Sequence, residues 1–172
     1  MKKNFIQNDI FIGVLSKEEF IEIAKEMISL STKEKQKIAI ISIQNPRDDN
    51  RELFEPLKLH EYGDFIVSKF WDLENDMGEL KAISDKESSI LANFIADNGD
   101  KKFLIHCSTG VSRSAGVARA VECLVKYNGD YYDYVTGNLF SKQIKDYPRY
   151  HPNYTVMVKI IENSKIKVKN NG

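Results

Sequence analysis

The stretch that decides the fold is Lys102-Phe103-Leu104-Ile105-His106-Cys107-Ser108-Thr109-Gly110-Val111-Ser112-Arg113-Ser114-Ala115-Gly116. The apolar run 103–105 is typical of a buried strand, and the apolar residues of 115–127 recur at the spacing of one helix face. The residues between them therefore form a strand-to-helix loop. This loop holds Cys107, then five small or uncharged residues, and Arg113 at the helix start.

A loop of this kind suits a tetrahedral dianion such as phosphate. Successive backbone N–H groups in a tight loop form a concave nest, and the first N–H groups of the following helix are unpaired. Arg113 adds a planar guanidinium that can donate two parallel hydrogen bonds to phosphoryl oxygens, which a lysine cannot do. The residues that we expect to bind the phosphate, besides Arg113, are Ser108, Thr109, Gly110, Val111 and Ser112.

Cys107 faces the same nest and is the candidate nucleophile. The donors of the loop and the dipole of the following helix favour its thiolate near neutral pH, and a thiolate can attack phosphorus in covalent catalysis. Ser114 can donate its O–H to the sulfur, which would help the thiolate to leave when the intermediate is hydrolysed. We expect His106 to orient the loop by hydrogen bonding to backbone, since an ionised thiol needs no base.

These residues carry a resemblance to a known family. His106-Cys107, five residues, then Arg113-Ser114 resembles the phosphate-binding loop of cysteine-dependent protein tyrosine phosphatases, most closely the compact dual-specificity branch. The resemblance covers about residues 38–127, and the closing helix at Pro152-Asn153-Tyr154 is similar to that of small microbial members. It implies a protein tyrosine or dual-specificity phosphatase that hydrolyses phosphate monoesters of proteins or peptides through a phosphocysteine intermediate.

The departing oxygen of a phosphate ester needs a proton, because an alkoxide or phenoxide is a poor leaving group. Asp72 directly follows the apolar run 65–71, so it stands at the carboxyl end of a strand, with Trp71 beside it to exclude water. Its place also resembles that of the general acid of compact dual-specificity phosphatases. We assign the general acid to Asp72, and Asp76, in the solvated turn 74–78, is the alternative.

Strand and helix patterns alternate along the rest of the chain. Capping boxes at Ser16/Glu19 and Ser84/Glu87 open two of the helices. This order predicts an α/β fold with a central four- or five-stranded, mostly parallel sheet, helices on both faces, and the site outside the carboxyl ends of the strands. The predicted strands are 10–15, 38–43 at the sheet centre, 65–71 and 103–105. The predicted helices are 16–30, 84–98, 115–127 and one through 156–161. We expect a solvated connector at 33–37 and an irregular or short-helical segment at 130–140.

The composition predicts the domain organisation, the partners and the location of the protein. A chain of 172 residues, 42% hydrophobic and 29% charged, predicts one domain over 1–172, with a frayed tail at 165–172. The resemblance implies that this is a phosphatase domain. Lysine plus arginine balance aspartate plus glutamate at 25 each, so we expect no nucleic-acid or membrane partner and a monomer. Free cysteines and the lack of an apolar run near the ~20 residues of a membrane span favour the cytoplasm.

Scattered cysteines and histidines match no common ligand pattern, so we predict no metal and no cofactor.

Two other functions use a similar loop. A rhodanese-like sulfurtransferase or an arsenate reductase needs less from an upstream acid, and the reductase also needs resolving thiols, for which only Cys123, expected in the core, is available. A phosphopeptide-binding module would usually lack the cysteine, arginine or acid. The loop interior adds no further cation, which favours a singly phosphorylated side chain and leaves phosphotyrosine and dual specificity open.

Overall fold

The computed structural model describes residues 5–137 and 148–170, and within them the side chains of 5–135 and 148–164. Its centre is a four-stranded sheet in the order β1-β4-β2-β3, in which every neighbouring pair is parallel. This confirms the predicted α/β fold. The strands are β1 Phe11–Leu15, β2 Ile38–Gln44, β3 Asp64–Lys69 and β4 Lys102–His106.

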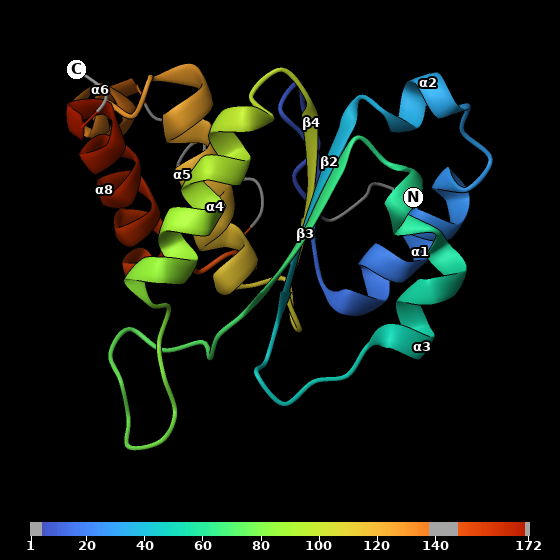
Figure 1. The fold of residues 1–172 in the computed structure, drawn as a ribbon, viewed down its shortest axis with the longest axis horizontal. Coiled ribbons are helices and arrows are strands. Elements are labelled where there is room, and N and C mark those ends of the chain that lie inside the picture. Colours follow the sequence, from blue (N-terminus) through green and yellow to red (C-terminus); the bar gives the residue numbers. More distant parts are fainter. Residues whose placement is uncertain (1–4, 138–147, 171–172) are drawn as a thin grey trace.

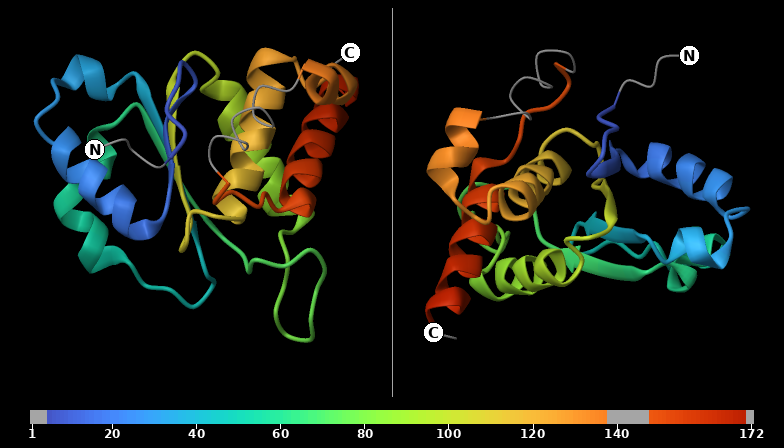
Figure 2. Two further views of the ribbon diagram at one scale, coloured as in Figure 1. Left: turned by 180° about the vertical axis from the view of Figure 1, so that it is seen from behind. Right: turned by 90° about the horizontal axis from the view of Figure 1, so that it is seen from above.

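Helices cover both faces of the sheet (Figures 1 and 2). On one face lie α1 Lys17–Met27, α2 Thr32–Lys35, α3 Arg51–Phe54 and the short 3-10 turns η1 Glu55–Leu57 and η2 Leu59–Glu61. On the other face lie α4 Asp85–Asp97, α5 Arg113–Lys126, α6 Tyr131–Gly137 and α8 Tyr154–Asn170. Helix α8 continues to Asn170, so it extends into the segment 165–172. The sequence predicts that this segment is frayed, and this stays a prediction.

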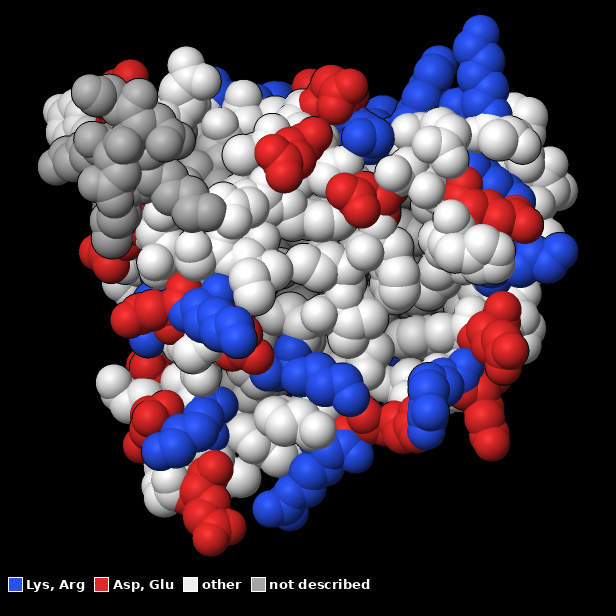
Figure 3. All heavy atoms as spheres, viewed as in Figure 1, with Lys and Arg blue, Asp and Glu red and all other residues white. Residues whose placement is uncertain are grey.

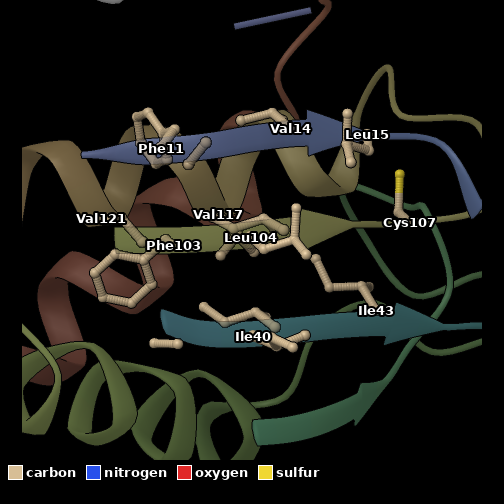
Figure 4. Close-up of a cluster of buried hydrophobic side chains, with 14 of the residues drawn as sticks. Phe11, Val14, Leu15, Ile40, Ile43, Phe103, Leu104, Cys107, Val117 and Val121 are labelled. Atoms are coloured by element: carbon tan, nitrogen blue, oxygen red, sulfur yellow. The ribbon is translucent and has the colours of Figure 1, made fainter. Parts of the chain in front are cut away.

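The sequence places β2 correctly at the centre of the sheet. All seven of its residues are buried, because β4 and β3 flank it and helices cover both of its faces. Its apolar side chains join those of β1, β4 and α5 in one core (Figure 4). Cys107 lies just past the carboxyl end of β4, beside Leu15 at the end of β1, so the core ends where the candidate site begins.

Both predicted capping boxes are present. The Ser16 side chain accepts from the Glu19 N–H at the start of α1 while the Glu19 carboxylate accepts from the Ser16 N–H, and Ser84 and Glu87 do the same at α4. Such reciprocal bonds satisfy two N–H groups that a helix start leaves unpaired. The first of these caps matters for function, because it fixes the chain at the end of β1, next to Cys107.

The connector 33–37 differs from the prediction of a solvated turn. Residues Thr32–Lys35 form the one-turn helix α2, capped by Ser31 and Glu34. Lys35 is buried, and its ammonium forms an ion pair of 2.6 Å with Glu61. The sequence could not indicate this burial, because the partner of Lys35 lies in η2, at a distant place in the chain.

The segment predicted as irregular or short-helical at 130–140 is helical over Tyr131–Gly137, and residues 138–140 lie outside the described residues. Cys123 is fully buried in α5, which confirms the expected core position.

In the described part of the chain, no helix is both long and apolar enough to cross a lipid bilayer. Figure 3 shows cationic and anionic side chains interspersed on the face viewed, around a broad uncharged area, so neither charge dominates that face.

Candidate active site

The predicted strand–loop–helix unit is present: β4 ends at His106, and α5 begins at Arg113. The Cys107 N–H donates to the Leu15 carbonyl oxygen at 3.2 Å, which holds the start of the loop against the end of β1. The chain after β3 reaches the same edge of the sheet, so segments that follow three of the parallel strands meet there. This is the position outside the carboxyl ends of the strands that the sequence predicts.

The carbonyl groups of the loop are held from outside by backbone donors. Lys17 donates its N–H to the Ser108 oxygen at 3.3 Å, His151 to the Val111 oxygen at 3.0 Å, and Asn153 to the Ser112 oxygen at 3.1 Å. These bonds pair three carbonyl groups of the loop with residues outside it. In the described part of the chain, no protein acceptor binds the N–H groups of Ser108, Thr109, Val111 and Ser112.

Gly110 makes the tight curvature of this loop possible. Its φ of +70° lies in the left-handed region, and a Cβ built there would overlap the backbone of Leu15 and Ser16. Its N–H donates to Cys107 Sγ at 3.3 Å. Only glycine therefore brings this N–H to the sulfur while the loop packs against the end of β1.

Cys107 itself is buried, with 1% of its surface exposed. Its sulfur lies 3.2 Å from Ser114 Oγ, and the thiol donates to this oxygen. In the thiolate form the direction reverses, and the Ser114 hydroxyl and the Gly110 N–H both donate to sulfur. The geometry thus brings together the cysteine, the serine and the N–H nest that the sequence assigns to one site.

Arg113 is buried beneath the loop with one donor left open. Its Nη1 donates to the Phe70 carbonyl oxygen at 2.8 Å, and its Nη2 donates to Ser108 Oγ at 3.0 Å. Its Nε is one of two buried side-chain polar atoms without a hydrogen-bond partner among the described residues, the other being the Tyr62 hydroxyl. A buried unpaired donor on a cation is costly, so this N–H is explained best by an anionic acceptor.

Asp72 is held against the loop. Its Oδ1 accepts from Ser112 Oγ at 2.7 Å and from Asn153 Nδ2 at 3.0 Å. A cavity of about 510 Å³ opens beside these three residues and is also lined by Glu74 and 150–152. Asp72 and Ser112, the last loop residue before α5, therefore line the same cavity.

Asp76, the alternative acid, is tied elsewhere. Its Oδ1 accepts from the Ala82 N–H at 3.0 Å, and Lys81 lies 3.3 Å from its Oδ2. The pKa of this carboxyl lies below its ordinary value, mainly because the Ala82 N–H donates to it and, to a smaller extent, because Lys81 does. Asp76 is thus bound to residues outside the loop, whereas Asp72 contacts the loop itself, so the geometry favours Asp72.

His106 is enclosed and neutral. It stacks on the Phe20 ring with centroids 4.2 Å apart, and burial lowers its pKa from 6.5 to about 4. Its Nδ1 lies 3.4 Å from the Cys107 carbonyl oxygen, and its Nε2 lies 2.8 Å from Ser42 Oγ. Because the carbonyl can only accept, the neutral ring donates from Nδ1 and accepts at Nε2 from the Ser42 hydroxyl. The contact with the loop backbone is the one expected from the sequence.

Two neighbours of the loop escaped the sequence analysis. Arg149 donates to both carboxylate oxygens of Glu19, each at 2.7 Å, and the guanidinium holds the pKa of Glu19 below its ordinary value. Its Nη2 lies so close to Gly110 that a Cβ there would meet it at 2.7 Å. The sequence analysis named Asn153 only as part of the start of the closing helix. Neither residue belongs to a motif, since both act on residues far away in the sequence.

The described residues contain no group of three or more His, Cys, Asp and Glu side chains that could hold a metal ion. The candidate site is thus built from one thiol, one guanidinium, one carboxylate, hydroxyl groups and backbone N–H groups. Groups of these kinds can bind an oxyanion and exchange protons with it.

The chain has the fold of the cysteine-dependent tyrosine phosphatases, as the resemblance in its sequence implies. The Yvh1 phosphatase domain from Chaetomium thermophilum matches with a TM-score of 0.53 and 17% sequence identity, over 95% of this chain and 96% of that domain. The human tyrosine phosphatase-like serine/threonine/tyrosine-interacting protein has a TM-score of 0.49 and 15% identity, over 90% of this chain and 87% of its own. At such identities the likeness shows the fold alone. No protein-family model and no curated protein matches the sequence.

Proposed function

We propose that this protein is a metal-independent phosphatase that hydrolyses phosphate monoesters of proteins or peptides through a phosphocysteine at Cys107. The observation that carries the proposal is the set of unpaired donors around one buried sulfur: the open N–H groups of the loop and the Arg113 Nε. A tetrahedral dianion satisfies these donors together. The phosphatase fold supports the same conclusion.

In the first step the Cys107 thiolate attacks phosphorus, an S–P bond forms, and the bond between phosphorus and the leaving oxygen breaks. Asp72 gives its proton to that oxygen, so an alcohol or phenol departs. Arg113 and the loop N–H groups bind the three non-bridging oxygens, on which charge rests in the transition state. The position of Asp72 against Ser112, at the edge of the nest, suits this transfer.

In the second step water attacks the phosphocysteine. The Asp72 carboxylate takes a proton from this water, an O–P bond forms, and the S–P bond breaks to release inorganic phosphate and the thiolate. The Ser114 hydroxyl, 3.2 Å from the sulfur, donates to the departing thiolate. Both steps balance without any cofactor.

The alternatives fit less well. Arsenate reduction needs a second thiol that can reach the first, and Cys123 is fully buried within α5. Neither that reaction nor sulfur transfer gives a role to a carboxylate held against the loop. A phosphopeptide-binding module would have no use for a nucleophile and an acid on either side of the bound phosphate.

The substrate that fits best is a singly phosphorylated side chain. Arg149, the further cation beside the loop, is already paired with the Glu19 carboxylate through two hydrogen bonds, so it offers little charge to a second phosphate. A monomeric protein in the cytoplasm, acting on phosphorylated proteins or peptides, remains our expectation from the sequence.

The test is hydrolysis of an aryl phosphate by purified protein in the presence of a chelator, with trapping of the phosphoenzyme by rapid denaturation. We expect turnover by the wild type, a trapped phosphate on Cys107, and no turnover by Cys107→Ser. The control is Cys123→Ala, because it removes a buried thiol away from the loop and should stay active. Loss of activity with chelator, or turnover by Cys107→Ser, contradicts this mechanism.

A further inference from the structure

Asn153 joins three parts of the candidate site although no catalytic motif includes it. Its backbone N–H donates to the Ser112 oxygen of the loop, and its side-chain amide donates to Asp72 Oδ1 at 3.0 Å and to the Leu73 carbonyl oxygen at 3.3 Å. It thus connects the phosphate-binding loop, the segment that carries the candidate acid, and the start of α8.

The orientation of the Asn153 amide is fixed. Its Oδ1 accepts from the Val156 N–H at 3.1 Å, as an N-cap does, so its Nδ2 is the end that faces Asp72. The residue is 5% exposed, and its carbonyl lies so close to Gly116 in α5 that a Cβ there would meet it at 2.6 Å. A side chain anchored at both ends in this way can position its neighbour.

The two donors to Asp72 use the same carboxylate oxygen. Ser112 Oγ and Asn153 Nδ2 both donate to Oδ1, which has two lone pairs. Among the described residues, Oδ2 has no hydrogen-bond partner. When Asp72 is protonated, Oδ1 is already saturated, so the proton resides on Oδ2.

We propose that Asn153 is a positioning residue which, together with Ser112, anchors Asp72 through Oδ1 and directs the transferable proton to Oδ2. This inference rests on the proposed phosphatase function. Asn153 touches no reacting atom in this role. It acts through Asp72, which gives its proton to the leaving oxygen in the first step and takes a proton from water in the second. Its removal should therefore matter most for esters whose leaving groups need that proton.

Two variants separate this role from a structural one. Asn153→Asp keeps an oxygen that can cap α8, since aspartate is as good an N-cap as asparagine, but it has no N–H to give to Asp72. Asn153→Ala loses both contacts. The matched control is Asn163→Ala, which removes an amide on the same helix that donates to Ser88 Oγ and the Lys159 carbonyl oxygen, away from the loop.

The measurements are kcat/KM for phenyl phosphate, whose leaving group is weakly acidic, and for 2,4-dinitrophenyl phosphate, whose leaving group is strongly acidic. The ratio kcat/KM reports the first step, in which the leaving oxygen takes the proton. We expect Asn153→Asp and Asn153→Ala to lower kcat/KM for phenyl phosphate about 10-fold or more, as for a lost hydrogen bond to a charged group. The loss should be much smaller for the dinitrophenyl ester. Competitive inhibition by inorganic phosphate should stay the same, and Asn163→Ala should behave as the wild type.

A double-mutant cycle with Asp72→Asn gives the decisive outcome. If Asn153 acts through Asp72, its substitution should have little further effect in the Asp72→Asn background. An undiminished loss in that background, equal losses on both esters, or wild-type kinetics for Asn153→Asp would overturn the inference while wild-type turnover still supports the phosphatase. If the wild type hydrolyses neither ester, the proposed function itself fails.

Discussion

The nitrogens of Arg113 have separate tasks at the scale of a single residue. Nη1 and Nη2 are held by the Phe70 carbonyl and the Ser108 hydroxyl, so the guanidinium plane is set before any substrate binds. The Nε hydrogen is buried and has no hydrogen-bond partner among the described residues, so it stays available to an anion. The three N–H donors of a lysine all leave from one nitrogen, so they cannot reproduce the planar, spaced donors of the guanidinium.

Arg113→Lys should therefore lose most activity although it keeps the positive charge. We expect kcat/KM for an aryl phosphate to fall roughly 10²-fold or more, which is typical when a directed donor to a transition-state oxyanion is lost. The loss should appear in both kcat and KM, measured in steady state. A kcat/KM near that of the wild type would mean that only the charge of Arg113 matters.

The two candidates for the general acid, Asp72 and Asp76, lead to opposite predictions for their asparagine variants. Asp72→Asn should lower kcat about 10²-fold or more on a phosphotyrosine peptide, because the leaving oxygen then receives no proton. It should also flatten the alkaline limb of the pH–rate profile, and the loss should shrink for esters with very acidic leaving groups. Asp76→Asn serves as the control and should keep wild-type kinetics. The reverse pattern would place the acid at Asp76.

Sequence reasoning worked best where chemistry is local in the chain. Cys107, Arg113 and Ser114 could be placed in one site because the loop that joins them is short and contiguous. Asn153 and Arg149 could not, since their partners Asp72 and Glu19 lie in other parts of the chain. An asparagine before a helix indicates a cap and says nothing of what its second polar atom binds.

Among the structural elements, the loop 107–112 depends on the left-handed conformation of Gly110. Gly110→Ala should strain this φ and push the loop away from Leu15 and Ser16. We expect a loss of about 1–3 kcal/mol in the free energy of unfolding and a fall of more than 10-fold in kcat/KM. The measurements are urea denaturation and aryl phosphate hydrolysis.

Gly129→Ala is the matched control for this element. Gly129 also has a left-handed φ, of +73°, but a Cβ there would meet Leu124 only at an ordinary contact distance of 3.4 Å. It should share part of the stability loss and keep its activity. If both variants remain fully active, the exact course of the loop at Gly110 is not needed for function.

The elements themselves were largely predictable. Capping boxes and apolar periodicity located α1 and α4, and the β-branched run of β2 placed it at the sheet centre. Helix α2 was missed although Ser31 and Glu34 form a capping box, because the helix is one turn long and has no apolar face. The burial of Lys35 was missed because it depends on an ion pair with Glu61. Local patterns report which face of an element is apolar, whereas such pairs become visible only when distant segments meet.

On the scale of the whole molecule, His106 connects the sheet to the loop. Gln44 donates to Ser42 Oγ at 3.1 Å, the Ser42 hydroxyl donates to His106, and the ring reaches the Cys107 carbonyl. The neutral ring fits this series of hydrogen bonds. A second proton would turn Nε2 into a donor facing the Ser42 hydroxyl, within a buried site.

The pKa of His106 predicts how stability depends on pH. Burial lowers this pKa from 6.5 to about 4, so between these values the unfolded chain binds the proton and the folded protein does not. The free energy of unfolding should therefore fall by about 3 kcal/mol as the pH drops from about 6.5 to 4, and this contribution is fully retained above 6.5.

Urea denaturation of the wild type and His106→Gln across this range measures the effect, since the difference between them removes the contribution of the carboxyl groups. His60→Gln is the control, because His60 is exposed on η2 and its loss should leave the pH dependence unchanged. Parallel curves for the wild type and His106→Gln would show that His106 does not cause the loss of stability in acid.

The backbone donors that hold the loop carbonyls come from opposite parts of the chain, Lys17 on one side and His151 and Asn153 on the other. During synthesis, a ribosome has made Cys107 well before it makes Asn153. The emerging chain carries its cysteine for that interval without the enclosure on which its proposed role as a nucleophile depends. Catalytic competence should therefore arise at the end of folding, and a chain that is cut short before α8 should be inert.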